Sequence, residues 1–401
     1  MSLRIKGKHR ILISKLTIVS LIILLSPLSN LMDKMIQNRG GDSLQLLLVL
    51  LMGTMVSYEM RKKNTSVRLN GVLFLAVLNV GYLLALWVMK GSGLNRITQF
   101  LIMIFVLCII KEIHWEDNDV VYLARLMNAM IILNLLWIPF TKHILKFSGF
   151  YNNSNSLGCL CICALYFTLI QKRDQKKVIF KKLAILLDCI VLLLSGSRAS
   201  ILASAFLMFG YFFRDQLIKK NNKKLFYVLF FVIIVTGVAV VYVLPDFRST
   251  EIGRVVEDFS TKYFGKTIYS GRQYIWKHMV SLSQNDPIFG LGLSTTFSAV
   301  KYGDARSAHS LYLQTIVQSG YVGLVLLMLF LFSIYKATLN RWTEESTLTV
   351  FLILSMLIHE MFEVSLTQNN WDQGIVFWLI MGLGLSNLTL KRQEVDSTNE
   401  Y

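Results

Sequence analysis

The chain has 401 residues, of which 54% are hydrophobic and 16% are charged, and its mean hydropathy is +0.53. Soluble domains of this size carry far more charge, so the composition excludes a single soluble core. The formal net charge of +17 would suit nucleic-acid binding. The basic residues gather in alternate short connections between apolar runs, however, which indicates membrane topology and no nucleic-acid partner.

Apolar runs of the length that spans a bilayer, ~17–25 residues, recur along the whole chain. We therefore expect an all-α polytopic membrane protein with about twelve transmembrane helices. The predicted spans are residues 16–31, 44–60, 69–89, 97–110, 120–139, 156–170, 183–196, 199–213, 225–244, 310–335, 346–362 and 373–390. The first is expected to stay in the protein, because the second follows closely and no small-residue cleavage site is clear.

The positions of lysine and arginine predict the orientation of these spans. Basic residues are dense in the N-terminal segment and around 61–68, 172–182 and 214–224, and sparse in the other short connections. Cytoplasmic connections carry this excess, so both termini are expected in the cytoplasm and the protein in the cytoplasmic (inner) membrane. The outer connections are then 32–43, 90–96, 140–155, 196–199, 245–309 and 360–372.

Cofactor and metal motifs are absent from the sequence. There is no phosphate-binding glycine loop, no dinucleotide-binding glycine pattern and no zinc-type spacing of His and Cys. Cys159, Cys161 and Cys163 alternate, which would spread them around a helix rather than join them at one metal. We expect no metal and no cofactor.

The connection at 245–309, between the ninth and tenth spans, is predicted to be a large extracytoplasmic loop. Irregular connections of this length are uncommon unless they carry function. Within it, residues 271–284 predict an amphipathic helix, with Tyr274, Ile275, Met279 and Leu282 on its apolar side.

Polar clusters fall on the same expected outer face as this loop. They are residues 149–158, 195–200, 271–276 with 287–292, 308–313 and, more weakly, 359–363. Polar groups at the ends of spans are also commonly solvated, so a polar residue there does not by itself indicate a functional site.

Three side chains in these clusters suit catalysis on an anionic substrate. Arg198 sits in a turn of two or three residues between apolar runs, where it either snorkels to lipid headgroups or binds an anion through its planar fork. Arg272 begins the predicted loop helix, whose N-terminus adds partial positive charge for an anion. His309 is a possible general base, or else a residue of the span boundary.

Other residues of the clusters have two possible roles each. Glu360 and Glu363 are alternative acids or bases, or partners of the two arginines. Trp276 and Tyr312 offer faces for stacking of sugar rings, or pack inside the protein.

The order of the clusters resembles that of the O-antigen ligase and O-antigen polymerase (Wzy) superfamily of bacterial glycan-assembly membrane proteins. The matching elements are residues 153–158, Ser197 with Arg198, Arg272 with Trp276, residues 287–292, and His309 with Tyr312, Gly320 and Gly323. The resemblance covers roughly residues 149–325. It divides the chain into N-terminal transmembrane helices (1–148), a ligase- or polymerase-like core (149–335), and C-terminal helices with a cytoplasmic tail (336–401).

This resemblance implies an enzyme that transfers glycan from an undecaprenyl-diphosphate-linked oligosaccharide on the outer membrane face, without metal or nucleotide. Arg198 and Arg272 would stabilise the departing diphosphate, and His309 matches the ligase-type histidine. The implied substrate-binding residues are Arg198, Arg272, Trp276, Asn155, Tyr312 and Glu360. Membrane lipid, a flippase and a chain-length regulator are the implied partners.

Two departures from the superfamily pattern favour a repeat-unit polymerase over a ligase, and the expected product is a surface polysaccharide such as a capsule or exopolysaccharide. Ser310 follows the matched histidine, where ligases often have Asn, and Ser154 stands where Pro is frequent. The alternatives are a ligase that moves a finished glycan to a lipid or wall acceptor, and a flippase or exporter of the same lipid-linked glycan. Asp188, the one acid deep within a span, is the best support for the transporter.

Overall fold

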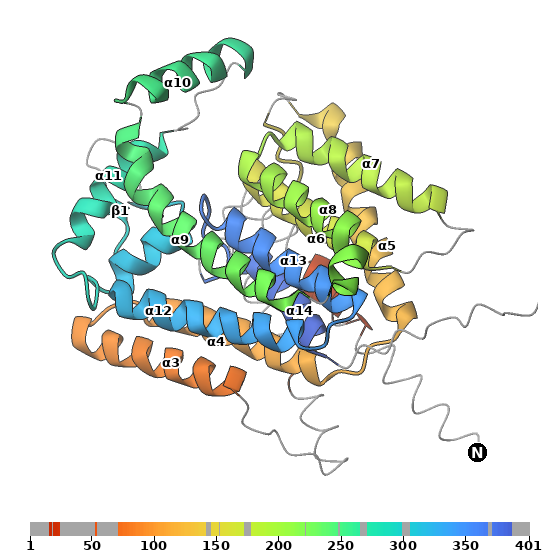
Figure 1. Cartoon of the computed structure of the whole chain (residues 1–401), viewed down its shortest axis with the longest axis horizontal. Helices are drawn as coiled ribbons and strands as arrows, with labels where there is room; N and C mark the ends of the chain where they lie inside the picture. Colours follow the sequence, from red (N-terminus) through yellow and green to blue (C-terminus); the bar gives the residue numbers. More distant parts are fainter. Residues whose placement is uncertain are drawn as a thin grey trace, which may run out of the picture.

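The computed structural model describes residues 71–386, except 142–145, 152, 172–177, 221, 248, 265–270, 299–304 and 368–370, together with 16–17, 19–24 and 53. Figure 1 shows the arrangement of its helices. They are α3 (Gly71–Lys90), α4 (Leu94–Glu112), α5 (Asp117–Leu136), the 3-10 helix η1 (Ile138–Phe140), α6 (Ser154–Ile170), α7 (Val178–Ser195), α8 (Arg198–Lys219), α9 (Lys223–Phe247), α10 (Glu251–Phe264), α11 (Arg272–Ser283), α12 (Leu311–Leu339), α13 (Glu344–His359) and α14 (Trp371–Leu385). The strands β1 (Phe297–Ser298) and β2 (Ala305–Arg306) form one short antiparallel hairpin.

The helices confirm an integral membrane protein. Within the described residues, 6 helical segments are long and apolar enough to cross a membrane: α3, α4, α5 with η1, α8, α9 and α12. A helix lies at each predicted span from 69–89 onward, whereas the spans predicted at 16–31 and 44–60 lie largely outside the described residues. The total of about twelve spans therefore stays a prediction.

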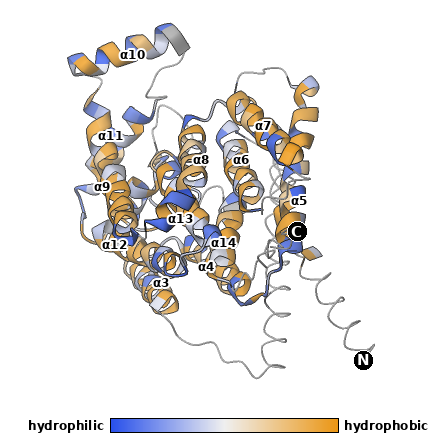
Figure 2. Cartoon of the chain, turned by 45° about the vertical axis from the view of Figure 1, so that its right-hand side comes forward, coloured by the Kyte–Doolittle hydropathy of each residue, from blue (hydrophilic) through white to orange (hydrophobic). Residues whose placement is uncertain are grey.

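Three short helices form the centre of the bundle. All residues from 156 to 170 in α6 and from 346 to 359 in α13 are buried, and α14 is buried over 373–383. The surrounding helices expose apolar side chains on their outer faces; on α3, for example, Val77 is 59% exposed and Val88 74%. Figure 2 shows this ring of apolar outer helices around α13 and α14. Such outer faces suit lipid, which is as apolar as the side chains themselves.

Small residues let the central helices approach one another closely. A Cβ atom at Gly158 of α6 would lie 2.3 Å from the Ser200 hydroxyl of α8, and one at Gly382 of α14 would lie 2.9 Å from the Leu107 carbonyl oxygen of α4. Close contact through small residues is a usual basis of helix packing in membranes. It brings the start of α6 against the start of α8.

Helix α12 is broken at Gly320, whose backbone angles (φ 66°, ψ −174°) are not helical. Its 29 residues would extend about 44 Å, more than a bilayer core, whereas residues 321–339 alone extend about 28 Å. The short first segment, 311–319, therefore lies at one end of the bundle.

The loop 287–292 fills the break in α12. The amides of Leu291 and Gly292 donate to the carbonyls of Val317 and Gln318 (2.8 and 3.1 Å), and the amides of Tyr321 and Val322 donate to the carbonyls of Pro287 and Ile288 (2.9 and 3.3 Å). An ion pair of 2.8 Å between Asp286 and Lys90, at the end of α3, fixes the loop from the other side. These bonds satisfy the backbone groups that the break leaves unpaired.

The predicted loop helix at 271–284 is confirmed as α11, but its predicted faces are partly wrong. Tyr274 is 64% exposed, while Trp276 is fully buried with Ile275 and Met279 in a small second core. This core joins α11 to Val241 of α9 and to the first segment of α12. Helix α11 therefore caps the bundle.

Helix α10 was not predicted and stands apart from the bundle in both views (Figures 1 and 2). Its exposed residues include Ile252, Val255 and Phe259, while Glu257 and Ser260 on its other side are buried. The connection after α9 is thus not irregular: over the described residues it holds two helices and a hairpin.

We expect Gly320→Ala to lower the melting temperature of the detergent-purified protein. The new Cβ would lie 2.0 Å from the Ile288 carbonyl oxygen, and φ at this position is positive. Backbone strain of this kind costs about 1–3 kcal/mol. The control is Gly81→Ala in α3, where a Cβ meets nothing within 4 Å. Equal melting of the two variants would show that the docked loop does not stabilise the fold.

Candidate functional site

The starts of four helices and the turn after α13 meet at one end of the bundle. Asn155 lies in the first turn of α6, Arg272 is the first residue of α11, and His309 precedes α12. All three side chains face Glu363, which follows α13. We call these four residues, together with Arg198 at the start of α8, the Glu363 cluster.

Glu363 is the centre of the cluster. Nη2 of Arg272 donates to its Oε1 at 2.7 Å, and Nδ2 of Asn155 donates to the same oxygen. Nδ1 of His309 lies 3.5 Å from Oε2, at the outer limit of a hydrogen bond. The side chain of Glu363 is 7% exposed, that of Arg272 19% and that of His309 36%. The carboxylate thus forms the floor of the cluster, and the cation and the imidazole form its accessible rim.

The neighbours of Glu363 keep it ionised. Burial acts to raise its pKa, but the hydrogen bond and charge of His309, with the charges of Arg272 and His359, outweigh burial, so the pKa of Glu363 is lowered. An ionised carboxylate can orient both Arg272 and His309 at neutral pH.

A tight turn sets Arg198 at the start of α8. Gly196 in this turn has φ 60°. The Ser195 hydroxyl donates to the Leu192 carbonyl and accepts from the Ser197 amide, while the Ser197 and Ser200 hydroxyls lie 2.8 Å apart. The buried serines hold the turn against α6, and the Arg198 side chain is exposed.

Arg198 interacts electrostatically with Arg272 and with a residue of α10. The charge of Arg272 repels Arg198, and Glu257 of α10 attracts it. Two guanidinium groups that repel each other are stabilised when an anion lies between them. The positive ends of the α8 and α11 dipoles add to this attraction for an anion.

The backbone next to His309 is tied to the same end of the bundle. The amide of Leu311 donates to the carbonyls of both Glu360 and Glu363 (2.9 and 3.0 Å). His309 itself has φ 48°, an uncommon angle for a residue other than glycine. Nε1 of Trp276 donates to the Ala308 carbonyl at 2.7 Å. These contacts fix the position from which the imidazole projects.

Three residues with predicted substrate contacts are buried instead. Trp276, Tyr312 and Glu360 are each 0% exposed. Trp276 stacks on Phe362 as well as holding Ala308, and the Tyr312 hydroxyl donates to the Leu357 carbonyl. The Glu360 carboxylate accepts from the amides of Ser365 and Leu366. Each supports the site from within, so we do not retain them as substrate contacts.

The sequence alone indicates Glu363 only as an alternative acid or base, or as a partner of the arginines. The signal that singles it out is its place one turn beyond Glu360, at a span end on the same expected face as the arginines. Asp188 is buried in α7 and is not part of the cluster. Among the described residues, no group of three His, Cys, Asp or Glu side chains could hold a metal ion.

One comparison with known families covers part of this site. A family model described as O-antigen ligase matches residues 183–328. Over this segment the chain is similar to the O-antigen ligase family, and we call the segment the O-antigen ligase domain. It contains Arg198, Arg272 and His309, whereas Asn155 and Glu363 lie outside it. The predicted superfamily is therefore confirmed, and the domain supports a membrane enzyme of the ligase or polymerase type. No curated protein matches the chain.

We expect Glu363→Gln to melt at a lower temperature than wild type at pH 7, and we expect this difference to disappear in acid. A group with a lowered folded-state pKa stabilises above its ordinary pKa, here 4.5, and this stability is lost as pH falls through the lower folded value. Replacing a charged acceptor costs about 1.5–3 kcal/mol. The measurement is the melting temperature of both proteins from pH 7 to below pH 4.5, with Asp258→Asn on the exposed side of α10 as control. A difference independent of pH would contradict the ionised state of Glu363.

Proposed function

We propose that the protein is a polysaccharide polymerase. It transfers undecaprenyl-diphosphate-linked oligosaccharide repeat units to a growing surface glycan, without metal or cofactor. The observation that carries this proposal is the Glu363 cluster, in which Arg272 and His309 share one carboxylate and Arg198 lies within the electrostatic range of Arg272. The O-antigen ligase domain supports the same class of reaction.

The reaction joins the acceptor to the first sugar of the donor. An acceptor hydroxyl oxygen bonds to the anomeric carbon, the bond from that carbon to the phosphate oxygen breaks, and the electron pair leaves with the lipid diphosphate. Arg198 and Arg272 stabilise the negative charge that develops on this leaving group. The starts of α8 and α11 supply partial positive charge at the same point.

His309 accepts the proton of the acceptor hydroxyl. Its Nδ1 faces Glu363, so Nε2 is the nitrogen that takes the proton. Glu363 then stabilises the imidazolium, in the manner of a carboxylate that orients a catalytic histidine. The 3.5 Å separation shortens as positive charge forms on the ring, since catalytic hydrogen bonds are often long before substrate binds.

The site is proposed to face the outside of the cytoplasmic membrane. At the opposite end of the bundle, Arg214 pairs with Glu344 at 3.2 Å, and Lys219 and Lys336 lie in the last turns of α8 and α12. Basic residues at that end agree with the positive-inside rule. A flippase would then deliver the lipid-linked units, and a chain-length regulator would act beside the polymerase.

We expect a null strain complemented with Arg198→Ala, Arg272→Ala or His309→Ala to accumulate single lipid-linked repeat units on the outer face. Loss of one transition-state donor slows such steps about 10²–10³-fold, and loss of a general base about 10²–10⁴-fold. The measurement is glycan length on gels, with membrane levels of each variant checked. The controls are Arg254→Ala on α10 and His278→Ala on α11, which replace exposed residues, and strains that carry them should still produce long chains.

Other products would point to another function. Long chains that stay on the carrier lipid in the null strain would identify a ligase. Single units on the inner face would identify transport, for which Asp188 is the candidate residue. Long chains from all three cluster variants would show that the catalytic site lies elsewhere.

A further inference from the structure

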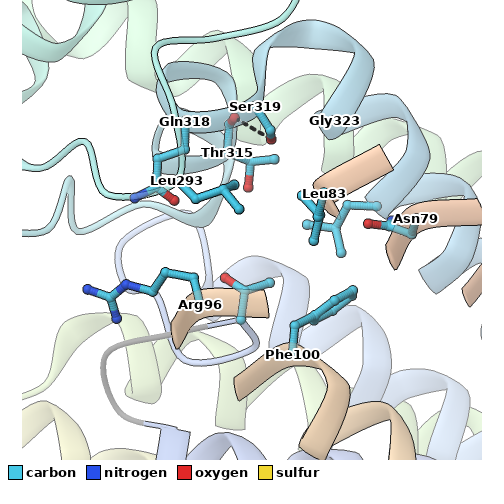
Figure 3. Close-up of a pocket in the computed structure, with 11 residues that line it drawn as sticks. Asn79, Leu83, Arg96, Phe100, Leu293, Thr315, Gln318, Ser319 and Gly323 are labelled. Atoms are coloured by element: carbon cyan, nitrogen blue, oxygen red, sulfur yellow. Dashed lines mark hydrogen bonds between the residues drawn. The ribbon is translucent and has the colours of Figure 1, made fainter. Parts of the chain in front are cut away.

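A second polar site lies between α3, α4 and the broken part of α12. Figure 3 shows this pocket, with Asn79 on one side, Arg96 on the other, and Phe100 and Thr315 between them. Gln318 of α12 and Thr367 of the connection after α13 complete the polar wall. The pocket is separate from the Glu363 cluster, since the two share no lining residue.

Asn79, which lines this pocket, has an unpaired side-chain nitrogen. The residue is 3% exposed, and its Nδ2 has no hydrogen-bond partner within the described part of the chain. A buried donor left unpaired costs about 1–3 kcal/mol, and more where the surroundings are lipid. An amide kept at this cost in the middle of a membrane helix points to a polar ligand.

The opposite wall presents hydroxyl and amide groups. Thr315 and Ser319 lie one turn apart, and their hydroxyls donate to the carbonyls of Leu311 and Thr315. A Cβ at Gly323 would lie 2.1 Å from the Ser319 hydroxyl oxygen, so glycine there makes room for Ser319 at the pocket. Because both hydroxyl protons are donated within the helix, the two oxygens on this wall are left to accept hydrogen bonds from the hydroxyl groups of a sugar.

The remaining lining suits a sugar better than a diphosphate. Arg96 is the only cation among the residues that line the pocket, whereas two arginines serve the Glu363 cluster. Phe100 is held edge-on against Phe330 and Trp378, at centroid distances of 6.2 and 6.0 Å. The space of about 50 Å³ takes the edge of one sugar ring, since one water molecule needs roughly 10–15 Å³.

The pocket is connected to the Glu363 cluster through one helical segment. The segment 311–319 begins at the Leu311 amide, which binds the Glu363 carbonyl, and ends at Ser319 in the pocket wall. His309 precedes this segment, and Thr367, which lines the pocket, lies four residues after Glu363. A glycan seated in the pocket is therefore positioned relative to the catalytic histidine.

We propose that this pocket binds a sugar of the acceptor glycan while the Glu363 cluster binds the diphosphate of the donor. This assignment rests on the proposed polymerase function. It makes Asn79 and Gly323 determinants of acceptor binding, on helices α3 and α12, and it gives the N-terminal part of the chain a direct role in the reaction.

The test separates the two sites by using two probes on the detergent-purified full chain. The first probe is the repeat-unit oligosaccharide released from its carrier by mild acid, and the second is undecaprenyl diphosphate. We expect Asn79→Leu to weaken oligosaccharide binding at least tenfold and to leave undecaprenyl diphosphate binding within twofold. Arg272→Ala should do the reverse. Asn95→Leu, exposed at the start of α4, is the matched control and should bind both probes as wild type.

A melting measurement and a second variant distinguish loss of binding from loss of folding. Asn79→Leu should melt no lower than wild type, because it removes an unpaired amide, and Gly323→Ala, which crowds Ser319, should weaken oligosaccharide binding independently. Unchanged oligosaccharide binding in both variants, or a wild type that polymerises but binds no oligosaccharide, would overturn the pocket assignment. If Arg198→Ala and Arg272→Ala bind undecaprenyl diphosphate as wild type, the proposed function fails instead.

Discussion

The site depends on one buried carboxylate. Glu363 accepts from Arg272 and Asn155 and faces His309, and these partners come from three helices that are distant in sequence. Without that negative charge, Arg272 would lose its ion-pair partner, and nothing else described would orient the imidazole. Arg272 and His309 lie within the O-antigen ligase domain, but the carboxylate that they face lies outside it. Asn155 on α6 and Glu363 after α13 complete the cluster from outside the matched segment.

A broken helix provides the frame for this cluster. The four backbone hydrogen bonds between the loop 287–292 and the break at Gly320 hold the first segment of α12 at one end of the bundle. His309 lies at one end of that segment and the polar pocket at the other. The loop 287–292 and the break in α12 stabilise each other. Glycine at 290, 292 and 320 allows the positive φ at these positions and the close approach of the loop backbone to the α12 backbone.

The sequence predicted the elements that have local causes. Apolar runs located the helices at the predicted membrane spans from α3 onward, and the turn at 195–200 and the helix start at Arg272 could be recognised from polar residues beside those runs. It could not show that Trp276 and Tyr312 turn inward, because an aromatic residue at a span boundary packs or stacks equally well on local evidence. The central role of Glu363 and the burial of Glu360 depend on how the turn after α13 meets α12, which is a tertiary contact. Helix α10 was missed because a polar stretch with a narrow apolar stripe differs little from an exposed loop.

In the proposed mechanism, one end of the bundle binds two substrates, with the donor diphosphate between Arg198 and Arg272 and the acceptor hydroxyl beside His309. The most direct measurement is the structure of the protein in a lipid nanodisc with undecaprenyl diphosphate bound. The account predicts both phosphates within hydrogen-bonding distance of the two arginines, on the side from which His309 projects. Phosphates bound in the Arg96 pocket, or at the basic end near Arg214 and Lys219, would contradict it.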